Sequence, residues 1–440
     1  MTEISVVVRG GSVVTPEGLR RIDVALGGST IVGLAETIEV PSAVTVLDAR
    51  GCLIAPGLVD LHTHLRQPGR EEAETVETGA RAAALGGYTA VLAMPNTEPA
   101  IDAAGVARDV LALGRTAPAE VAVSGAITVG RAGQALAPLG ELAELGVRIF
   151  TDDGAGVQDG ALMRRALDYA KGLGVTLAQH CEDDHLSSGG AMHEGCWSSR
   201  LGLPGIPAAA EESMVARDIQ LVRLTGAPVH FLHLSTAGSV ELVRQAKAEG
   251  LPVTAEAAPH HMLLTHAEVA NYDPVFKVNP PLRADDDVAA VIAGLCDGTI
   301  DAIATDHAPH APEVKDVPFD QAPPGMLGLQ TALPLAWQVL SPRLSPARIF
   351  ALMSSQPAGI AGLRVTDARR AGHSAHGGPI ELGGSANLCV FDPTASTVVD
   401  PTRLASRSRN TPYAGRTFTG AVRHTILRGE PVVIDAVAQR

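Results

Sequence analysis

The chain has 440 residues, of which 46% are hydrophobic and 19% charged, and its formal net charge at pH 7 is −14. This length and apolar content allow a large buried core, and the negative charge argues against the basic surfaces that bind nucleic acid or anionic membranes. No window approaches the ~20 apolar residues that cross a bilayer, and the first residues do not resemble a leader. We therefore expect a cytoplasmic protein that binds neither nucleic acid nor a membrane. The five cysteines lack CxxC spacing, which predicts reduced thiols.

Short β-branched runs occupy both ends of the chain. Residues 1–55 contain VVVRGGSVV and VTVLDARGCLI, and residues 363–440 contain SANLCVFDP and PVVID. Short strands separated by Gly, Pro and Asp are typical of a β-sandwich. We therefore predict one small β-sandwich domain built from both termini, with residues 56–362 inserted between its two parts.

Between residues 56 and 362, short apolar runs alternate with Ala- and Leu-rich helical stretches, which is typical of a parallel sheet. Helical stretches such as GALMRRALDYAKGLG end on glycine, as helices commonly do. The predicted strands cover residues 57–61, 89–96, 120–129, 147–153, 175–183, 228–236, 252–261 and 300–310. Eight such units predict an α/β fold, a (β/α)8 TIM-like barrel, whose active site lies at the carboxyl ends of the strands.

Polar side chains gather at these predicted strand ends, where residues far apart in sequence can reach one metal ion. His62 and His64 share a face, because side chains at i and i+2 of a strand point the same way, and two imidazoles suit one divalent ion. Taken alone, this pair also fits ordinary packing, as do the single His180 and His233. The polar residues at strand ends are His62, His64, Asn96, Asp153, His180, His233, Asp306 and His310.

Four histidines exceed what one catalytic ion needs, so we expect two metals bridged by a carboxylate. The motif FTDDG offers Asp152 and Asp153, whose alternative role is a turn or helix cap. We expect Asp153 to bridge and Asp152 to be structural. Asp306 ends an apolar strand, where a carboxylate needs a cation, and we expect it to bind metal and serve as general base, then general acid. His310 is expected at the rim as a hydrogen-bond donor to substrate, or else is a plain loop histidine.

A set of motifs spanning residues 57 to about 420 resembles the amidohydrolase superfamily, and within it the dihydroorotase family of the long bacterial type. The motifs are GLVDLHTHLRQPG, MPNTEP, FTDDG, HCED, HLST, APHH, KVNPPLR, TDHAPH, PPGMLGLQTALPL and SRNTPYAGRTFTG. The resemblance implies the reversible cyclisation of N-carbamoyl-L-aspartate to L-dihydroorotate in pyrimidine (UMP) biosynthesis. It implies one or two Zn²⁺ ions, with two favoured, held by His62, His64, Asp153, His180, His233 and Asp306.

The same resemblance implies which residues bind substrate: Arg66, Asn96 and Asn279 at its carboxylate side, and His310 with the backbone near Gly325 at the ring. A guanidinium can bind a carboxylate bidentately. Strand alternation is expected to place Arg66 on the face of His62 and His64, although a surface arginine in LRQPG would also be unremarkable. The Pro-rich residues 308–326 are expected to cover the site.

Two departures from the family pattern are visible. Hydantoinases, dihydropyrimidinases and some dihydroorotases are similar to this chain but bridge their metals with a carboxylated lysine, whereas VRIFTDDG contains no lysine and the nearest is Lys171. This favours the aspartate-bridged type. Gln330 stands where the family usually has glutamate, which puts the local support of the loop after the eighth strand in doubt.

Two other functions remain open. The chain resembles other cyclic amidohydrolases, such as allantoinase or hydantoinase/dihydropyrimidinase, and it resembles non-catalytic dihydroorotase-like scaffolds for aspartate carbamoyltransferase. This chain has a histidine or an aspartate at every position where the resemblance implies a metal ligand, which argues against a non-catalytic scaffold. The expected partners are a small-molecule substrate, a second copy of the chain in a homodimer, and aspartate carbamoyltransferase.

Overall fold

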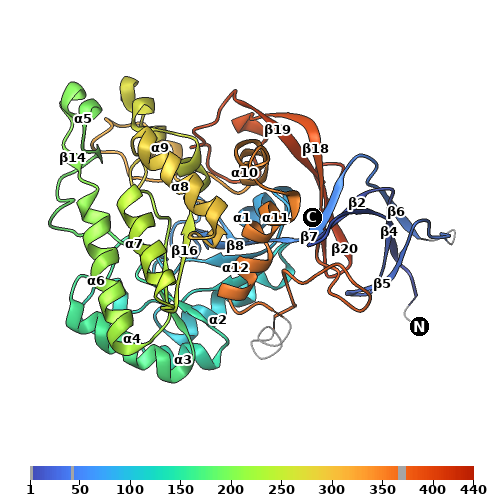
Figure 1. Ribbon diagram of the computed structural model, residues 1–440, viewed down its shortest axis with the longest axis horizontal. Coiled ribbons are helices and arrows are strands. Elements are labelled where there is room, and N and C mark those ends of the chain that lie inside the picture. Colours follow the sequence, from blue (N-terminus) through green and yellow to red (C-terminus); the bar gives the residue numbers. More distant parts are fainter. Residues whose placement is uncertain (1–2, 41–43, 365–372) are drawn as a thin grey trace.

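The computed structural model describes residues 3–40, 44–364 and 373–440. One part is rich in helices, and the other is built of strands from both ends of the chain (Figure 1). The predicted domain boundary at residue 363 is followed closely by residues 365–372, which lie outside the described residues. Within the described ranges, no helix combines the length and apolar character needed to cross a membrane.

Strands from both chain ends form two sheets. The first sheet contains β5 (Thr30–Ala35), β4 (Asp23–Gly27), β1 (Val6–Arg9) and β6 (Thr45–Asp48), in this order. The second contains β21 (Val437–Ala438), β20 (Glu430–Ile434), β19 (Thr417–Leu427), β18 (Leu388–Val398), β7 (Leu53–Pro56), β2 (Ser12–Thr15) and β3 (Gly18–Arg21). β7 pairs with β18 in antiparallel register, with Leu53 opposite Phe391. Side chains of both sheets, such as Leu26 and Ile54, share one hydrophobic core, so the two sheets pack face to face.

Parallel strands form the centre of the helix-rich part. They are β8 (Leu58–Thr63), β9 (Tyr88–Ala93), β10 (Glu120–Val123), β11 (Ile149–Phe150), β12 (Thr176–Gln179), β15 (Val229–Phe231), β16 (Val253–Ala257) and β17 (Ala302–Ile303). Two ladders have the orders β10-β9-β8 and β11-β12-β15-β16-β17. Isolated parallel bridges join Gly125 to Phe150 and Thr63 to His307, so each ladder meets the other at both of its edges.

The parallel strand β9 presents two apolar faces. In β9, Val91 and Ala93 belong to the core that lies against the helices, whereas Ala90 and Leu92 belong to a second, inner core. Because side chains alternate across a strand, a strand covered on both faces reads as a continuous apolar run. This explains why the sequence TAVLA contains no polar residue after its threonine.

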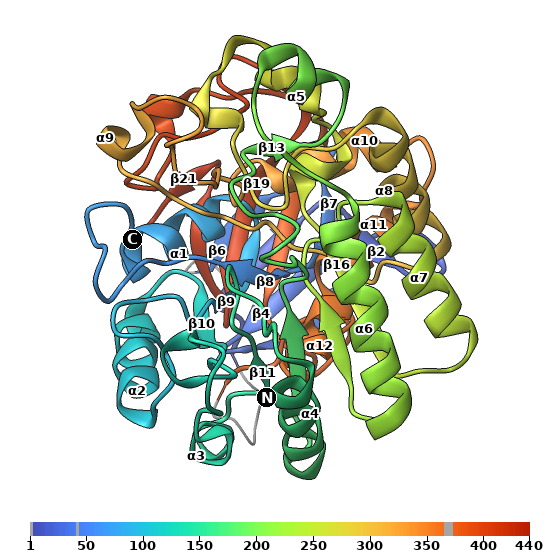
Figure 2. The same ribbon diagram turned by 90° about the vertical axis from the view of Figure 1, so that its left-hand side faces the viewer.

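Helices surround the parallel strands (Figure 2). They are α1 (Val76–Leu85), α2 (Ala104–Leu113), α3 (Leu139–Glu144), α4 (Gly160–Leu173), α5 (Cys196–Leu201), α6 (Ala209–Thr225), α7 (Ala237–Ala248), α8 (Asp285–Asp297), α9 (Pro312–Lys315), α10 (Ala332–Leu340), α11 (Pro346–Met353) and α12 (Ser355–Ile360). Sequence signals define their ends. The Asp159 carboxylate accepts two backbone N–H groups at the start of α4, and Gly174, with φ of 68°, ends it.

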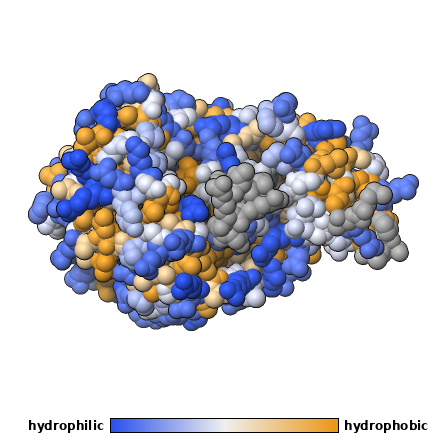
Figure 3. All heavy atoms as spheres, turned by 90° about the horizontal axis from the view of Figure 1, so that it is seen from below, coloured by the Kyte–Doolittle hydropathy of each residue, from blue (hydrophilic) through white to orange (hydrophobic). Residues whose placement is uncertain are grey.

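Shorter elements lie in the connections. They are β13 (Met192–His193), β14 (Gly205–Ile206) and the 3-10 helices η1 (Gly114–Thr116), η2 (Val129–Arg131), η3 (Pro259–Met262), η4 (His266–Asn271), η5 (Pro274–Phe276) and η6 (Pro401–Arg403). Over the face seen in Figure 3, hydrophilic and hydrophobic side chains are interspersed in small groups, as on ordinary protein surfaces.

The strand lengths predicted from sequence are wrong at several carboxyl ends. β16 stops at Ala257 rather than 261, because Pro259 has no N–H for the ladder and begins η3. β17 stops at Ile303 rather than 310. The residues beyond β17 form a loop, and this loop carries the candidate functional residues Asp306 and His310.

Candidate metal centre

Six buried polar side chains lie at the carboxyl ends of the parallel strands. Two of them come from β8 and the residue after it, and the others follow β11, β12, β15 and β17. Each is at most 5% exposed. They are the residues that the sequence predicted as metal ligands, namely His62, His64, Asp153, His180, His233 and Asp306.

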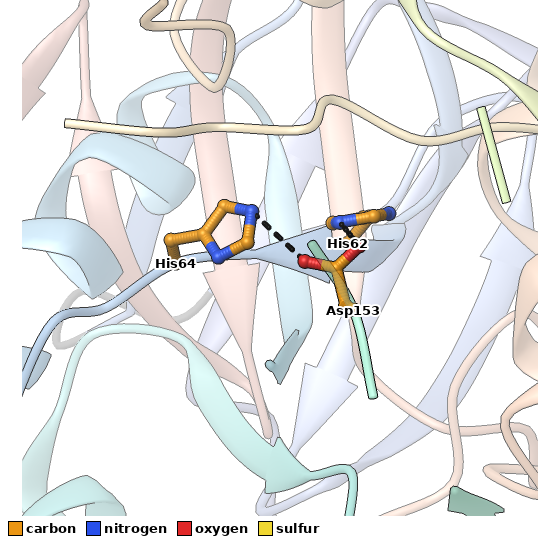
Figure 4. Close-up of side chains that lie close together, drawn as sticks. All are labelled: His62, His64 and Asp153. Atoms are coloured by element: carbon orange, nitrogen blue, oxygen red, sulfur yellow. Dashed lines mark ion pairs between the residues drawn. The ribbon is translucent and has the colours of Figure 1, made fainter. Parts of the chain in front are cut away.

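The first group of candidate ligands contains His62, His64 and Asp153, which face one another (Figure 4). His62 Nε2 lies 3.3 Å from Asp153 Oδ1, and His64 Nε2 lies 3.5 Å from Asp153 Oδ2. Asp306 joins them, because its Oδ1 lies 3.1 Å from His64 Nε2 and 3.6 Å from His62 Nε2. Two imidazoles and two carboxylates therefore point at one small volume.

The second group contains His180, His233 and the same Asp153. Asp153 Oδ1 lies 3.6 Å from His180 Nδ1 and 3.6 Å from His233 Nε2, and these two nitrogens are 2.9 Å apart. The Asp153 carboxylate is thus shared by both groups. A shared carboxylate is the arrangement that can bridge two cations.

The tautomers of His62 and His64 fit a cation. His62 Nδ1 lies 2.8 Å from Glu256 Oε1, and His64 Nδ1 lies 2.9 Å from the side-chain oxygen of Asn96. Both oxygens accept, so Nδ1 carries a proton in each ring, and when Nε2 is not protonated it presents a lone pair to a cation. The buried His62 Nε2 has no hydrogen-bond partner among the described residues. Because this lone pair faces carboxylate oxygens, the donor set fits a divalent metal ion between them.

Electrostatics leads to the same conclusion. Burial alone raises the pKa of Asp153, but the charge that His62 carries when protonated, together with the adjacent His180 and His233 imidazoles, outweighs it and holds the pKa well below its usual range. Burial also raises the pKa of Asp306, yet the hydrogen bond with His64 and the charge of His62 bring it below its usual value. Two ionised, buried carboxylates side by side are stable only with positive charge nearby.

Sequence reasoning missed Glu256, which holds the metal-facing histidine from behind. Glu256 is fully buried in β16 and contacts His62 Nδ1 at 2.8 Å and His230 Nε2 at 3.0 Å. Burial raises its pKa, but the hydrogen bonds from His230 and His62 outweigh this and lower the pKa to about 2. The available signal was a single carboxylate within the apolar run VTAEAA. Glu256 lies within β16, whereas the sequence prediction considered polar residues at strand ends.

We expect Glu256→Gln to lower the affinity for a divalent cation such as zinc by about 10- to 100-fold, the usual effect of losing a carboxylate behind a histidine ligand. Glutamine has one carbonyl oxygen and one NH2 group in place of the two carboxylate oxygens. It can therefore accept from only one of the two imidazole N–H groups and places a donor opposite the other. Competition with a chromophoric chelator measures the affinity. Glu120→Gln is the matched control, since Glu120 is a mostly buried carboxylate that contacts His373 and His376 at 2.9 and 3.2 Å. An unchanged affinity in Glu256→Gln would contradict the orienting role.

Asp60 and Asp152 hold the backbone around the centre. The Asp60 carboxylate accepts the N–H groups of His62 and Thr305 at 3.2 and 2.9 Å, which aligns β8 with the segment after β17. Asp152 Oδ1 accepts the N–H groups of Ile127 and Thr128 at 2.8 and 3.0 Å. Asp152 is therefore engaged with backbone, while its neighbour in sequence faces the histidines.

Arg66 does not follow the expected strand alternation. β8 ends at Thr63, and Arg66 has φ of 60°, so the i and i+2 argument stops before it. Its Nε instead donates to the Pro309 carbonyl at 3.1 Å, which ties it to the loop after β17. Burial and the charge of Arg70 lower the pKa of Arg66 to about 10, so the guanidinium remains charged at neutral pH.

His310 is oriented differently from the sequence expectation. Its Nε2 lies 2.8 Å from the Pro324 carbonyl, which only accepts, so Nε2 carries the proton. Burial, together with the charges of Arg66 and Lys315, lowers the pKa of His310 to about 3. The ring is therefore neutral at pH 7 and its free Nδ1 is an acceptor. In this geometry the Nε2 proton is directed at Pro324 and the ring offers a substrate an acceptor rather than the expected donor, so the role of His310 toward substrate stays a prediction.

The remaining residues expected to bind substrate lie in loops. The Asn279 amide donates to Glu182 Oε1 at 3.3 Å, and the Gly325 N–H donates to the Lys277 carbonyl at 2.9 Å. Gln330, which departs from the family pattern, accepts the Ala405 N–H at 2.7 Å. A glutamate would accept this bond equally well, so the local support is retained.

Comparisons with known proteins point to one family. A family model described as Dihydro-orotase-like matches residues 51–239. The chain is 48% identical over 438 residues to the dihydroorotase of Pelotomaculum thermopropionicum, covering 99% of this chain and 100% of that protein. It is likewise 48% identical over 438 residues to the dihydroorotase of Mycobacterium tuberculosis, covering 98% and 99%.

Solved structures share the fold. An L-hydantoinase (dihydropyrimidinase) from Arthrobacter aurescens superposes with a TM-score of 0.87 at 23% identity, covering 100% of this chain and 98% of that one. A dihydropyrimidinase from Brevibacillus agri superposes with a TM-score of 0.82 at 22% identity, covering 98% and 96%. At this identity the likeness is one of architecture.

Proposed function

Because the chain belongs to the dihydroorotase family, we propose that it catalyses the reversible cyclisation of N-carbamoyl-L-aspartate to L-dihydroorotate, with loss of water, in pyrimidine synthesis. The observation that carries the chemistry is the Asp153 carboxylate shared by two groups of buried histidines. The full-length identity of 48% to dihydroorotases, against 23% to a hydantoinase, favours dihydroorotate over a hydantoin as substrate.

The proposal includes a closed (β/α)8 barrel. The parallel bridges at both edges of the two ladders and the inner apolar core support closure, and active sites of such barrels lie at the carboxyl ends of the strands. We also propose the domain division into residues 56–362, which carry the site, and a sandwich domain of residues 1–55 and 363–440. The mixed core of the two sheets supports this division.

The proposed cofactor is zinc, with two ions. His62, His64 and Asp306 would hold one ion, His180 and His233 the other, and Asp153 both. Histidine and carboxylate donors are the usual zinc ligands. Zinc, when bound, supplies Lewis acidity that lowers the pKa of water and polarises a carbonyl.

The chain's own groups would handle protons and orientation. Asp306, ionised because of its imidazole neighbours, accepts the proton of the attacking water in the hydrolytic direction and returns it to the leaving ring nitrogen. The charged Arg66, with Asn96 and Asn279, would bind the substrate carboxylate. The neutral His310 and the backbone near Gly325 would contact the ring, with His310 Nδ1 accepting a ring N–H.

The family also implies a homodimer and an association with aspartate carbamoyltransferase, and we carry both over as proposals. Sedimentation of the chain alone, and mixed with that enzyme, tests them. The competing idea of a non-catalytic scaffold is disfavoured by the six buried ligand positions.

Metal analysis combined with an activity assay tests the function. We expect purified protein to contain zinc and to hydrolyse dihydroorotate in preference to hydantoin and allantoin. Dialysis against a chelator should abolish activity, and added Zn²⁺ should restore it, because the donor set is complete within the chain. Preferred turnover of hydantoin or allantoin would reassign the substrate, and protein that is folded but free of metal and activity would support the scaffold.

A further inference from the structure

Asn410 lies in the motif SRNTPY and reaches the loop after β17 from far along the chain. It is 7% exposed and precedes β19. Its side-chain oxygen accepts the His310 N–H at 3.1 Å, and its amide nitrogen donates to the carbonyls of Ala308 and Gly325 at 2.9 and 3.1 Å. Both N–H groups of the amide and one oxygen lone pair are thus in use.

These contacts close the neck of the loop from residue 308 to 325. The Ala308 N–H donates to the Met326 carbonyl at 2.9 Å, so the two ends of the loop run side by side. Gly325 has φ of 136°, and a Cβ there would lie 2.7 Å from the Ala308 Cβ and 2.8 Å from His310 Nε2. Only glycine fits this contact. The Asn410 amide spans the neck at its tightest point.

The same neck connects the groups proposed to bind substrate. Arg66 donates to the carbonyl of Pro309, within the loop. The Gly325 N–H donates to Lys277, two residues before Asn279. The Asn410 amide therefore holds a stretch of backbone to which the segments of Arg66, His310 and Asn279 are connected. It touches none of the proposed metal ligands.

We propose that Asn410 is a positioning residue that sets the places of His310 and Gly325 for substrate binding. The inference rests on the proposed function for the identity of the substrate. Its physical basis is independent of that function: aspartate at this position replaces two N–H donors with an oxygen that faces two carbonyl oxygens, so the neck is repelled rather than held.

Asn410→Asp is the test, and Asn387→Asp is its matched control. Asn387 is 4% exposed, accepts the Arg428 N–H at 2.7 Å and donates to the Ala375 carbonyl at 2.8 Å. It therefore also bridges backbone segments, but beside β18 in the seven-stranded sheet. Both substitutions remove an amide that joins distant parts of the chain, and only one of them is at the loop.

We expect Asn410→Asp to raise the KM for dihydroorotate roughly tenfold or more, as the loss of one or two buried hydrogen bonds implies, with a smaller change in kcat. Zinc content should stay at the wild-type value. Trypsin should cut after Lys315 faster than in wild type, because this loop residue, whose Nζ donates to the carbonyls of Pro274 and Lys277, loses its ordered surroundings. Asn387→Asp should change neither KM nor the cutting rate.

A wild-type KM and cutting rate in Asn410→Asp would overturn the proposal. If that variant does not fold, Asn410→Ala decides, since it removes the three bonds without adding charge. Loss of folded protein in both variants, or equal falls in kcat and kcat/KM with unchanged KM, would assign Asn410 a purely structural role and also overturn the proposal. The proteolysis result does not depend on turnover, and the wild-type assay tests the proposed function separately.

Discussion

Asp306→Asn is expected to reduce kcat for dihydroorotate hydrolysis by about 10²- to 10⁴-fold, the usual contribution of a positioned proton-transfer group. Asparagine keeps the size of the side chain and one oxygen but cannot take up a proton at neutral pH. Asp306 lies 3.1 Å from His64 Nε2, so metal content must be measured beside kcat to separate loss of the base from loss of metal.

Asp301→Asn controls for the amide substitution. Asp301 lies just before the same strand, β17, at its opposite end, and accepts the Ala255 N–H at 2.9 Å and a bond from Lys247 Nζ at 2.6 Å. This control should lose some stability and keep its turnover. Substantial remaining activity in Asp306→Asn, with metal bound, would remove Asp306 from the role of base.

Asp153→Asn should abolish metal binding and activity together. The Asp153 carboxylate lies 3.3 Å from His62 and 3.6 Å from each of His180 and His233, so both ligand groups lose their common charge. Loss of a residue that hydrogen-bonds to a metal ligand usually lowers metal affinity by about 10- to 100-fold. We expect a larger fall in Asp153→Asn, because this carboxylate is itself a proposed ligand. Mass spectrometry of bound metal, with the dihydroorotate assay, measures both effects.

Asp152→Asn is the control for this change, since it alters the preceding buried aspartate. Asparagine can still accept the N–H groups of Ile127 and Thr128 through Oδ1. Metal content and kcat should therefore remain near wild type. A full complement of metal in Asp153→Asn would show that its carboxylate does not bridge the two groups.

Much of the candidate metal centre could be predicted from the sequence, because it follows from strand periodicity and from the common edge at which parallel strands end. His62 lies in β8 and His64 directly follows it, close enough to the strand for alternation to bring both imidazoles to one side. The ends of parallel strands meet at one edge, which brings His180 and His233 beside Asp153. Apolar runs predicted the positions of the strands, since strands buried on both faces contain few polar residues.

Other features depend on contacts that no local pattern encodes. Strand ends are fixed by where ladder partners stop, so the alternation expected to reach Arg66 fails after Thr63. Glu256 is recognisable only once His62 and His230 are seen to lie beside it. The Asn410 amide meets His310 across 100 residues of chain, and nothing in the motif SRNTPY indicates which loop it will reach.

The placement of β7 between β2 and β18 has a consequence for biosynthesis. In the nascent chain, β7 is synthesised directly before β8, the first of the parallel strands. The antiparallel partner of β7 is β18, which is translated only after all of the parallel strands from β8 to β17. Until then, one flank of β7 exposes backbone groups that can pair with another molecule. Messages truncated before β18 should therefore yield aggregating products, even though every proposed metal ligand has already been synthesised.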